Sequence, residues 1–136
     1  MRDEDKKALS QVRLAHAEEC LSAAKNLREN GNYKSAANRA YYTVFHAMRA
    51  VLSLNEIDMK RHSGVISEFR RLYIKTGIFQ SELSQMISSL FEIRSDSDYD
   101  DFFVISKNEV DEQIKNAELF LTSVRTYLGE ADGKHE

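Results

Sequence analysis

Four side chains suited to holding an anion fall on one face of the helix predicted over residues 33–55. At about 100° per residue, Arg39, Tyr42, His46 and Arg49 lie within an arc of roughly 80°. Guanidinium groups can pair with phosphate oxygens, and a phenol or an imidazole can stack on a base. The pattern therefore predicts a phosphate-binding face. An ordinary solvated helix face that carries one amphipathic tyrosine is the alternative.

A second group lies near the end of the helix predicted over residues 79–97. Arg94 follows Leu90 and Phe91 at spacings of four and three, so it continues the apolar stripe. A charge drawn toward a core costs several kcal/mol unless it is paired, and Asp98 is the expected partner. Arg94 is thus either a structural residue that fixes the helix end or an arginine presented at the floor of a cleft.

The other reactive side chains give weaker signals. His62 lies in a polar loop beside Lys60 and Arg61, where it could contribute to anion binding. His16 and Cys20, the single cysteine, lie on an apolar stripe, so we expect a packed histidine and a buried, inert thiol. One cysteine excludes an internal disulfide and any multi-cysteine metal site. No glycine-rich phosphate loop and no di-iron spacing is present, so we expect no metal and no cofactor.

Helical periodicity predicts the elements that position these residues, over residues 3–30, 33–55, 63–76, 79–97 and 106–129. The first is expected to bury the stripe Leu9, Val12, His16, Cys20, Ala23 and Leu27. The second is expected to bury Ala37, Tyr41, Val44, Met48, Val51 and Leu52. Gly31, Gly77 and Gly129 are the expected stops, and Ser106 with Glu109 forms a capping box. The aromatic run Tyr99, Phe102 and Phe103 is expected to pack back onto the bundle.

The predicted fold is all-α, an up-and-down four-helix bundle with one additional short helix. The 136 residues suit a single domain over 1–136, in which 130–136 form a disordered tail. The absence of proline and the presence of only 5 glycines argue against an all-β fold, which needs many turn residues. No apolar run reaches the roughly 18–20 residues of a membrane span, and the charged N-terminus lacks a secretory signal. We therefore expect a cytoplasmic protein with no membrane contact.

Charge is segregated along the chain. The formal net charge of −3 excludes general electrostatic coating of nucleic acid but leaves room for a local basic site. Residues 60–75 carry five basic side chains against one acidic one, and residues 92–101 carry five acidic side chains against Arg94. Opposite patches favour self-association or docking to a charged partner, and a mixed solvated surface is the alternative.

Three motifs resemble those of the HEPN family, at sensible spacing and over roughly residues 8–128. Residues 35–50 look like its second-helix signature. Residues 94–102 resemble the Arg-x-x-x-Asp-Tyr form of its fourth-helix motif, and the loop 60–64 also fits. The resemblance implies a small helical bundle that commonly forms a homodimer, with the motif helices meeting at a shared cleft. It also implies a cytoplasmic prokaryotic protein, often paired with a minimal nucleotidyltransferase as toxin and antitoxin.

Many HEPN proteins are metal-independent ribonucleases that use an arginine followed four to six residues later by a histidine. Arg94 matches the arginine, but no histidine follows it until His135. Asp98 is expected to be ionised at pH 7 and is a poor general acid there. His46 could take the missing role if its helix faces that of Arg94. The candidate catalytic residues are therefore Arg94 and His46.

The candidate ligand-binding residues are Arg39, Tyr42, Arg49, His62 and Asp98. Tyr99 is a candidate for nucleotide attachment by a nucleotidyltransferase partner, by its position alone. Three functions remain open at this point. They are a dimeric nucleotide- or RNA-binding component of a toxin–antitoxin or defence pair, a ribonuclease with a variant site, and a purely structural interaction bundle.

Overall fold

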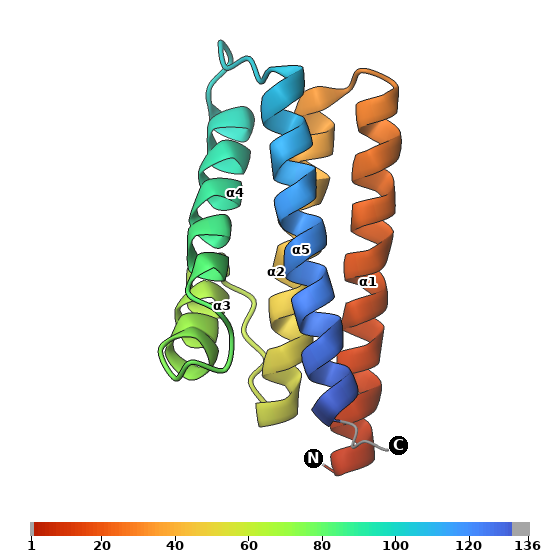
Figure 1. Ribbon diagram of the computed structural model, residues 1–136, viewed down its shortest axis with the longest axis vertical. Coiled ribbons are helices and arrows are strands. Elements are labelled where there is room, and N and C mark those ends of the chain that lie inside the picture. Colours follow the sequence, from red (N-terminus) through yellow and green to blue (C-terminus); the bar gives the residue numbers. More distant parts are fainter. Residues whose placement is uncertain (1, 132–136) are drawn as a thin grey trace.

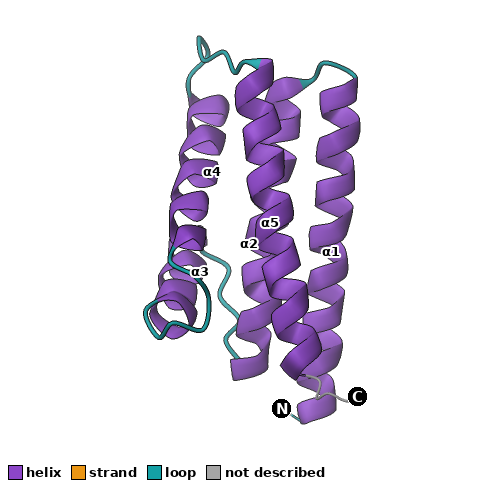
Figure 2. Cartoon of the chain, in the orientation of Figure 1, coloured by secondary structure: helices purple, strands orange, loops and turns teal. Residues whose placement is uncertain are grey.

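The protein is an up-and-down bundle of helices (Figure 1). The computed structural model describes residues 2–131, in which every regular element is helical (Figure 2). This confirms the predicted fold class of four long helices with a shorter one. The elements are α1 (Asp3–Glu29), α2 (Tyr33–Leu52), the 3₁₀ turn η1 (Ser53–Asn55), α3 (His62–Phe69), the π-helical turn η2 (Arg70–Ile74), α4 (Glu82–Tyr99) and α5 (Lys107–Ala131).

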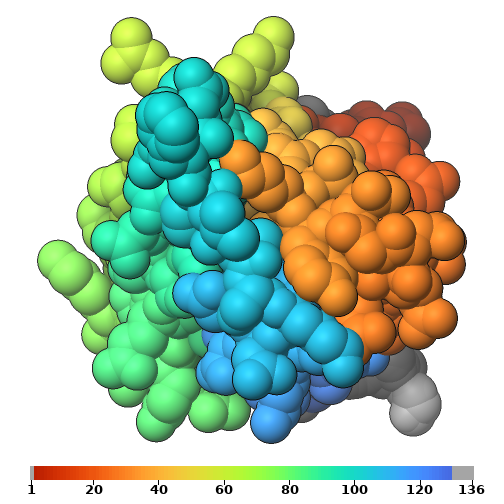
Figure 3. All heavy atoms as spheres, turned by 90° about the horizontal axis from the view of Figure 1, so that it is seen from above, coloured from red at the N-terminus to blue at the C-terminus, as the bar shows by residue number. Residues whose placement is uncertain are grey.

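Helix α2 is the central helix, in contact with α1, α3, α4 and α5. Alanines on several of its faces let these neighbours approach closely, and the predicted apolar face is buried as expected. The view from above shows one end of the bundle, where the loop after α4 lies beside the turn into α2 (Figure 3). A central helix of this kind leaves few places where its polar side chains can reach solvent.

The predicted buried stripe of α1 is wrong in part. Val12 and His16 are exposed, whereas Ala17 and Ala24 are completely buried and Arg13 is nearly so. Helices α1 and α2 pack through small residues on both sides, so the contact face centres on alanines rather than on the larger apolar side chains. Cys20 is buried as predicted.

Most helix ends follow their sequence signals. Gly31 and Gly77 adopt left-handed φ angles of +80° and +81° at the expected turns. The capping box is present, because the Ser106 amide donates to the Glu109 carboxylate and the Glu109 amide donates to the Ser106 hydroxyl.

Two predicted boundaries differ from the structure by two or three residues. Helix α4 begins at Glu82 and not at Phe79, because Phe79 is buried in the preceding turn against Phe69. Gly129 lies inside α5, where a glycine in the last turn costs little, and the helix continues to Ala131. Two residues of the predicted tail are therefore helical, and residues 132–136 lie outside the described part of the chain.

Candidate functional site

Arg94 is attached to α2 through two tyrosines. Its Nη2 atom donates to the Tyr42 hydroxyl at 3.2 Å, and its guanidinium carbon lies 5.4 Å and 5.6 Å from the ring centroids of Tyr41 and Tyr42. Its Nε atom lies 3.0 Å from Asp98 Oδ2, which is the ion pair that the spacing predicts. The Arg94 side chain is only 16% exposed, so these contacts hold the guanidinium in place and solvent reaches only a small part of it.

The packing of α4 explains this position. Leu83, Ile87 and Leu90 are buried in the core, and Arg94 follows them along the same side of the helix. Because α4 remains helical as far as Tyr99, Asp98 stays one turn beyond Arg94. The side chain is therefore directed at α2 by the same apolar stripe that holds α4 in place.

Tyr42 is the meeting point of the predicted site residues. The Arg39 guanidinium carbon lies 4.9 Å from the centre of its ring, and the His46 ring centroid lies 6.0 Å away. A cleft of about 330 Å³ opens beside this group between the ends of α1, α2 and α4. Arg39 and Asp98 both line the cleft, so the residues from α2 and α4 face a common space.

His62 joins the group through Tyr41, which sequence reasoning assigned only to the core. The His62 ring stacks on Phe45 at a centroid distance of 4.3 Å, and its Nδ1 atom lies 2.7 Å from the Tyr41 hydroxyl. Burial raises the pKa of Tyr41, and burial together with Arg94 lowers the pKa of His62. The phenol is therefore the donor and the imidazole is neutral. A buried tyrosine needs a hydrogen-bond partner, which is the signal that could have indicated this role.

His46 is a neutral base held in a positive environment. Its Nδ1 atom is buried with no hydrogen-bond partner among residues 2–131. Burial, which is the largest cause, and then His16, Arg49, Arg39 and Arg13 together lower its pKa to about 4. His16, expected in the core or an interface, is exposed and meets His46 edge to face at 5.7 Å. At pH 7 the neutral ring leaves Nδ1 able to make one more hydrogen bond, as donor or acceptor according to the tautomer.

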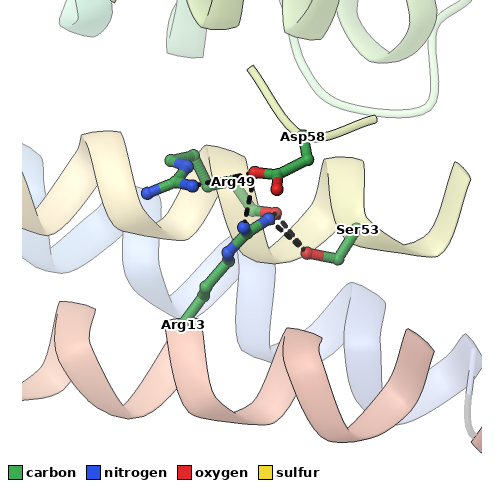
Figure 4. A network of polar contacts seen from close by, with 4 residues as sticks. All are labelled: Arg13, Arg49, Ser53 and Asp58. Carbon is green, nitrogen blue, oxygen red and sulfur yellow. Dashed lines mark hydrogen bonds and ion pairs between the residues drawn. The ribbon is translucent and has the colours of Figure 1, made fainter. Parts of the chain in front are cut away.

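Arg49 lies at the other end of this surface, in a separate network (Figure 4). Its Nη2 atom lies 3.0 Å from Asp58 Oδ1, and Arg13 donates to the same oxygen at 2.7 Å. Arg13 was not predicted as a site residue. Its place on the small-residue side of α1, three residues after Ser10 and four before Ala17, is the signal that could have revealed it.

We use the name polar face of α2 for the surface formed by Arg39, Tyr42, His46 and Arg49 of α2 together with Arg94, which reaches it from α4. We call the part around Tyr42 and Arg94 its near end and the part around Arg49 and Asp58 its far end. The structure thus places these five residues on one surface, with the Asp98 carboxylate at the Arg94 end and the Asp58 carboxylate at the Arg49 end.

Within residues 2–131, no helix has both the length and the apolar composition that a membrane span needs.

Tyr99 is the last residue of α4, and its side chain points into solvent. Tyr99 is 80% exposed and Phe102 is 93% exposed, so the prediction that this aromatic run packs onto the bundle is wrong for both. Only Phe103 is partly buried against the core. The loop is short and turns immediately after α4, which leaves these rings no apolar surface to cover.

Comparison with known proteins agrees with the motifs. The family model of the HEPN domain matches residues 10–127 of this chain. The chain belongs to the HEPN domain family. A protein of Thermotoga maritima named UPF0332 protein is 35% identical to this HEPN domain over 112 residues, which are 82% of this chain and 85% of the relative. A protein of Methanocaldococcus jannaschii named "Putative toxin MJ0142" is also 35% identical over 112 residues, 82% of this chain and 76% of its own.

A solved structure shares the fold of this HEPN domain. The crystal structure of ST0689, an archaeal HEPN homologue, superposes with a TM-score of 0.68. The superposition covers 88% of this chain and 97% of that one, with 19% sequence identity. At this identity the likeness concerns the helical arrangement.

Proposed function

We propose that this HEPN domain binds a phosphate group of an RNA or a nucleotide on the polar face of α2. The observation that carries the proposal is the placement of Arg94 on Tyr42, beside Arg39. A guanidinium held in this way still has its Nη1 atom to donate to a phosphate oxygen, without the cost of ordering a free side chain. The Arg39 guanidinium lies over the Tyr42 ring, and a base can stack on the outer face of this guanidinium.

The charge of the site supports an anionic ligand. The contacts described above involve four guanidiniums, from Arg13, Arg39, Arg49 and Arg94, and two carboxylates, from Asp58 and Asp98. Four positive and two negative charges leave two positive charges, and after burial Arg49, Arg39 and Arg13 contribute to the low pKa of His46. A phosphate diester or monoester supplies the charge that is missing.

We propose further that the domain acts in the cytoplasm as the toxin-like half of a toxin–antitoxin or defence pair. Two relatives from Methanocaldococcus jannaschii carry the word toxin in their names, which supports this context. A homodimer is part of the proposal, with the polar faces of two copies sharing one cleft. The exposed His16 contacts His46 on this face, and His16 with Val12, one turn before it on α1, would be covered by the second copy.

The partner in this proposal is a nucleotidyltransferase that modifies Tyr99. The phenolic oxygen would attack the α-phosphorus of a nucleoside triphosphate held by the partner. The bond from that phosphorus to the pyrophosphate oxygen breaks, pyrophosphate leaves, and the phenolic proton passes to a base on the partner. The 80% exposure of Tyr99 supports this step, because the hydroxyl can enter another protein's active site without unfolding α4.

Binding of a fluorescently labelled RNA oligonucleotide tests the central part of the proposal. Arg94→Gln should weaken binding by about tenfold or more, since a hydrogen bond to a charged group contributes about 1.5–3 kcal/mol. Arg125→Gln is the matched control, because this exposed arginine pairs with Glu18 on the other side of the bundle. Equal affinities of wild type and Arg94→Gln, or no binding by either, would favour the structural bundle instead.

The partner is tested by co-purification with the product of the neighbouring gene, followed by intact mass of this chain. The proposal predicts a stable complex and a mass increase of one or more nucleotidyl groups that Tyr99→Phe abolishes. A chain that never co-purifies and keeps its unmodified mass contradicts it.

A second candidate function is RNA cleavage with a variant site. The observation that favours it is the neutral imidazole of His62, which is linked through Tyr41 to Arg94. In such a reaction a 2′-oxygen attacks the adjacent phosphorus, and its proton passes to a neutral imidazole, from His62 or His46. The bond to the 5′-oxygen breaks, that oxygen takes a proton from water, and Arg94 balances the charge on the phosphorane.

Incubation with structured RNA separates cleavage from binding. Cleavage should disappear in Arg94→Ala and fall in whichever of His46→Ala and His62→Ala removes the base. Cleavage that survives Arg94→Ala would come from a contaminant or from another site.

A further inference from the structure

The two arginines at the far end of the polar face converge on one oxygen atom. Arg13 reaches from α1 and Arg49 from α2, and Asp58 approaches them from the loop over residues 56–61 (Figure 4). Asp58 Oδ1 lies 2.7 Å from Arg13 Nη2 and 3.0 Å from Arg49 Nη2. Two positive charges therefore share a single negative charge.

The Arg13 side chain is buried and is held by a hydrogen bond inside the fold. It is 8% exposed, and its Nη1 atom donates to Ser53 Oγ at 2.8 Å. Ser53 Oγ in turn donates to the Arg49 carbonyl oxygen at 2.8 Å, which ties the end of α2 to this network. The guanidinium of Arg13 is thus held in place whether or not Asp58 is present.

The donors at this site exceed what Asp58 accepts. Arg49 Nε is buried and has no hydrogen-bond partner among the described residues. A phosphate group carries several oxygens in a tetrahedral arrangement, so Arg13 Nη2 and Arg49 Nη2 can each donate to a different oxygen of one phosphate. The site is therefore matched better by a phosphate than by the single carboxylate oxygen it now holds.

Asp58 is attached loosely in comparison with the arginines. Its side chain is 57% exposed, and it belongs to a loop without regular secondary structure between η1 and α3. An ion pair with one partner this exposed contributes about 1 kcal/mol or less, because solvent screens it. The carboxylate can leave the arginines by a movement of the loop alone, with no change in the helices.

We propose that Arg13 and Arg49 form a phosphate-binding site in which the Asp58 carboxylate occupies the place of the phosphate and must be displaced by it. The inference rests on the proposed function, because Arg49 belongs to the polar face of α2. It adds Arg13 as a ligand-binding residue and makes Asp58 an internal competitor. The phosphate could be inorganic, could belong to a nucleotide or could be a second phosphate of a bound RNA strand.

The test measures the affinity of wild type and Asp58→Asn for two probes, inorganic phosphate and a short RNA oligonucleotide. Asparagine preserves the size of the side chain but does not compete as an anion. We expect Asp58→Asn to bind more tightly by roughly fivefold, the factor that corresponds to an exposed ion pair of about 1 kcal/mol. Adding Arg13→Gln should cancel the gain, and circular dichroism will show that each variant is folded.

Asp101→Asn is the matched control, because it removes the same charge from an exposed position in the α4–α5 loop. Its affinity should stay within twofold of wild type. A gain for both probes identifies a site for any phosphate, and a gain for RNA alone identifies a site for the strand. Either result supports the inference if Arg13→Gln cancels it. No gain in Asp58→Asn, or an equal gain in Asp101→Asn, overturns it.

The outcome for Arg94→Gln keeps the two proposals apart. If Arg94→Gln weakens RNA binding while Asp58→Asn changes nothing, the proposed function stands and the Asp58 inference fails. If Asp58→Asn gains affinity and Arg94→Gln has no effect, phosphate binds at Arg13 and Arg49 and the proposed role of Arg94 is wrong.

Discussion

The polar face of α2 ends in two arginine–carboxylate pairs that are built differently. Arg94 and Asp98 lie one turn apart on the same helix, with Nε and Oδ2 separated by 3.0 Å. Arg13 and Asp58 are 45 residues apart and meet only because α1, α2 and the following loop pack together. The first pair is determined by helix geometry, and the second is determined by the tertiary fold.

The difference concerns which partner can move. Asp98 cannot leave Arg94 by more than a change of rotamer while α4 remains helical, so it orients the guanidinium toward Tyr42. Asp58 is carried by a loop and can leave the arginines entirely. In the two proposals, one carboxylate therefore positions an arginine for a ligand, whereas the other competes with the ligand for two arginines.

The largest expected effect is on ligand affinity at the Arg94 end. Arg94→Lys keeps the positive charge but loses the planar guanidinium, which contacts Tyr42, Asp98 and a ligand at the same time, and the stacking on Tyr41 and Tyr42. We expect RNA affinity to fall by about tenfold or more, in line with about 1.5–3 kcal/mol for a hydrogen bond to a charged group. Fluorescence anisotropy measures this, and wild-type affinity in the lysine variant would mean that charge alone is used.

The next effect is on stability at the Arg13 end. Arg13→Met keeps the aliphatic part of the side chain but removes the donors to Ser53 and Asp58. We expect the free energy of unfolding to fall by about 1–3 kcal/mol, the cost of leaving a buried polar group unpaired. Urea denaturation measures this. Asp58→Asn should cost less than 1 kcal/mol, as is typical for an exposed ion pair. Equal losses would show that Asp58 is a fixed structural partner.

A pH effect of intermediate size should come from His46, between the two ends. Its pKa is lowered to about 4, first by burial and then by the basic side chains that face it, which are His16 and Arg13 on α1 and Arg39 and Arg49 on α2. The neutral form is therefore favoured in the folded state. Its contribution to stability is complete above the unfolded pKa near 6.5 and is lost as pH falls toward 4.

We expect this contribution to be about 1–2 kcal/mol after solvent screening is taken into account. Urea denaturation between pH 7 and pH 4 measures it, with His46→Gln as the comparison. The variant should lose less stability than wild type over this range. Parallel curves for the two proteins would mean that His46 does not titrate abnormally.

The smallest effect is expected at Tyr99, outside both pairs. Tyr99→Phe removes only an exposed hydroxyl, so the free energy of unfolding should change by less than about 0.5 kcal/mol. Urea denaturation and the RNA affinity of the unmodified protein should both match wild type. A large loss in either would show that Tyr99 takes part in folding or in the binding face itself.

The sequence was sufficient where a property depends on the helix repeat alone. The polar face of α2 and the pairing of Arg94 with Asp98 follow from spacings of three and four within one helix. The buried face of α2 follows from the same repeat, because its apolar residues are evenly spaced.

The sequence was insufficient where two elements must meet. The network of Arg13 with Asp58 and the bond of Tyr41 to His62 join residues that are 45 and 21 positions apart. Their formation depends on which face of α1 packs on α2, and that face is chosen by alanines rather than by the larger apolar residues. Periodicity favoured Val12 and His16 for the core, and the close packing of small side chains placed both in solvent.

The central claim is that a phosphate ligand binds on the polar face of α2 at Arg94, beside Arg39 and Tyr42. NMR observation of the arginine Nε–Hε signals during titration with a short RNA oligonucleotide tests this directly. The account predicts that the signals of Arg94 and Arg39 shift first, with those of Arg49 and Arg13 following as Asp58 is displaced. Shifts confined to Arg70 and Arg71, on the basic surface of α3 and η2, would contradict it.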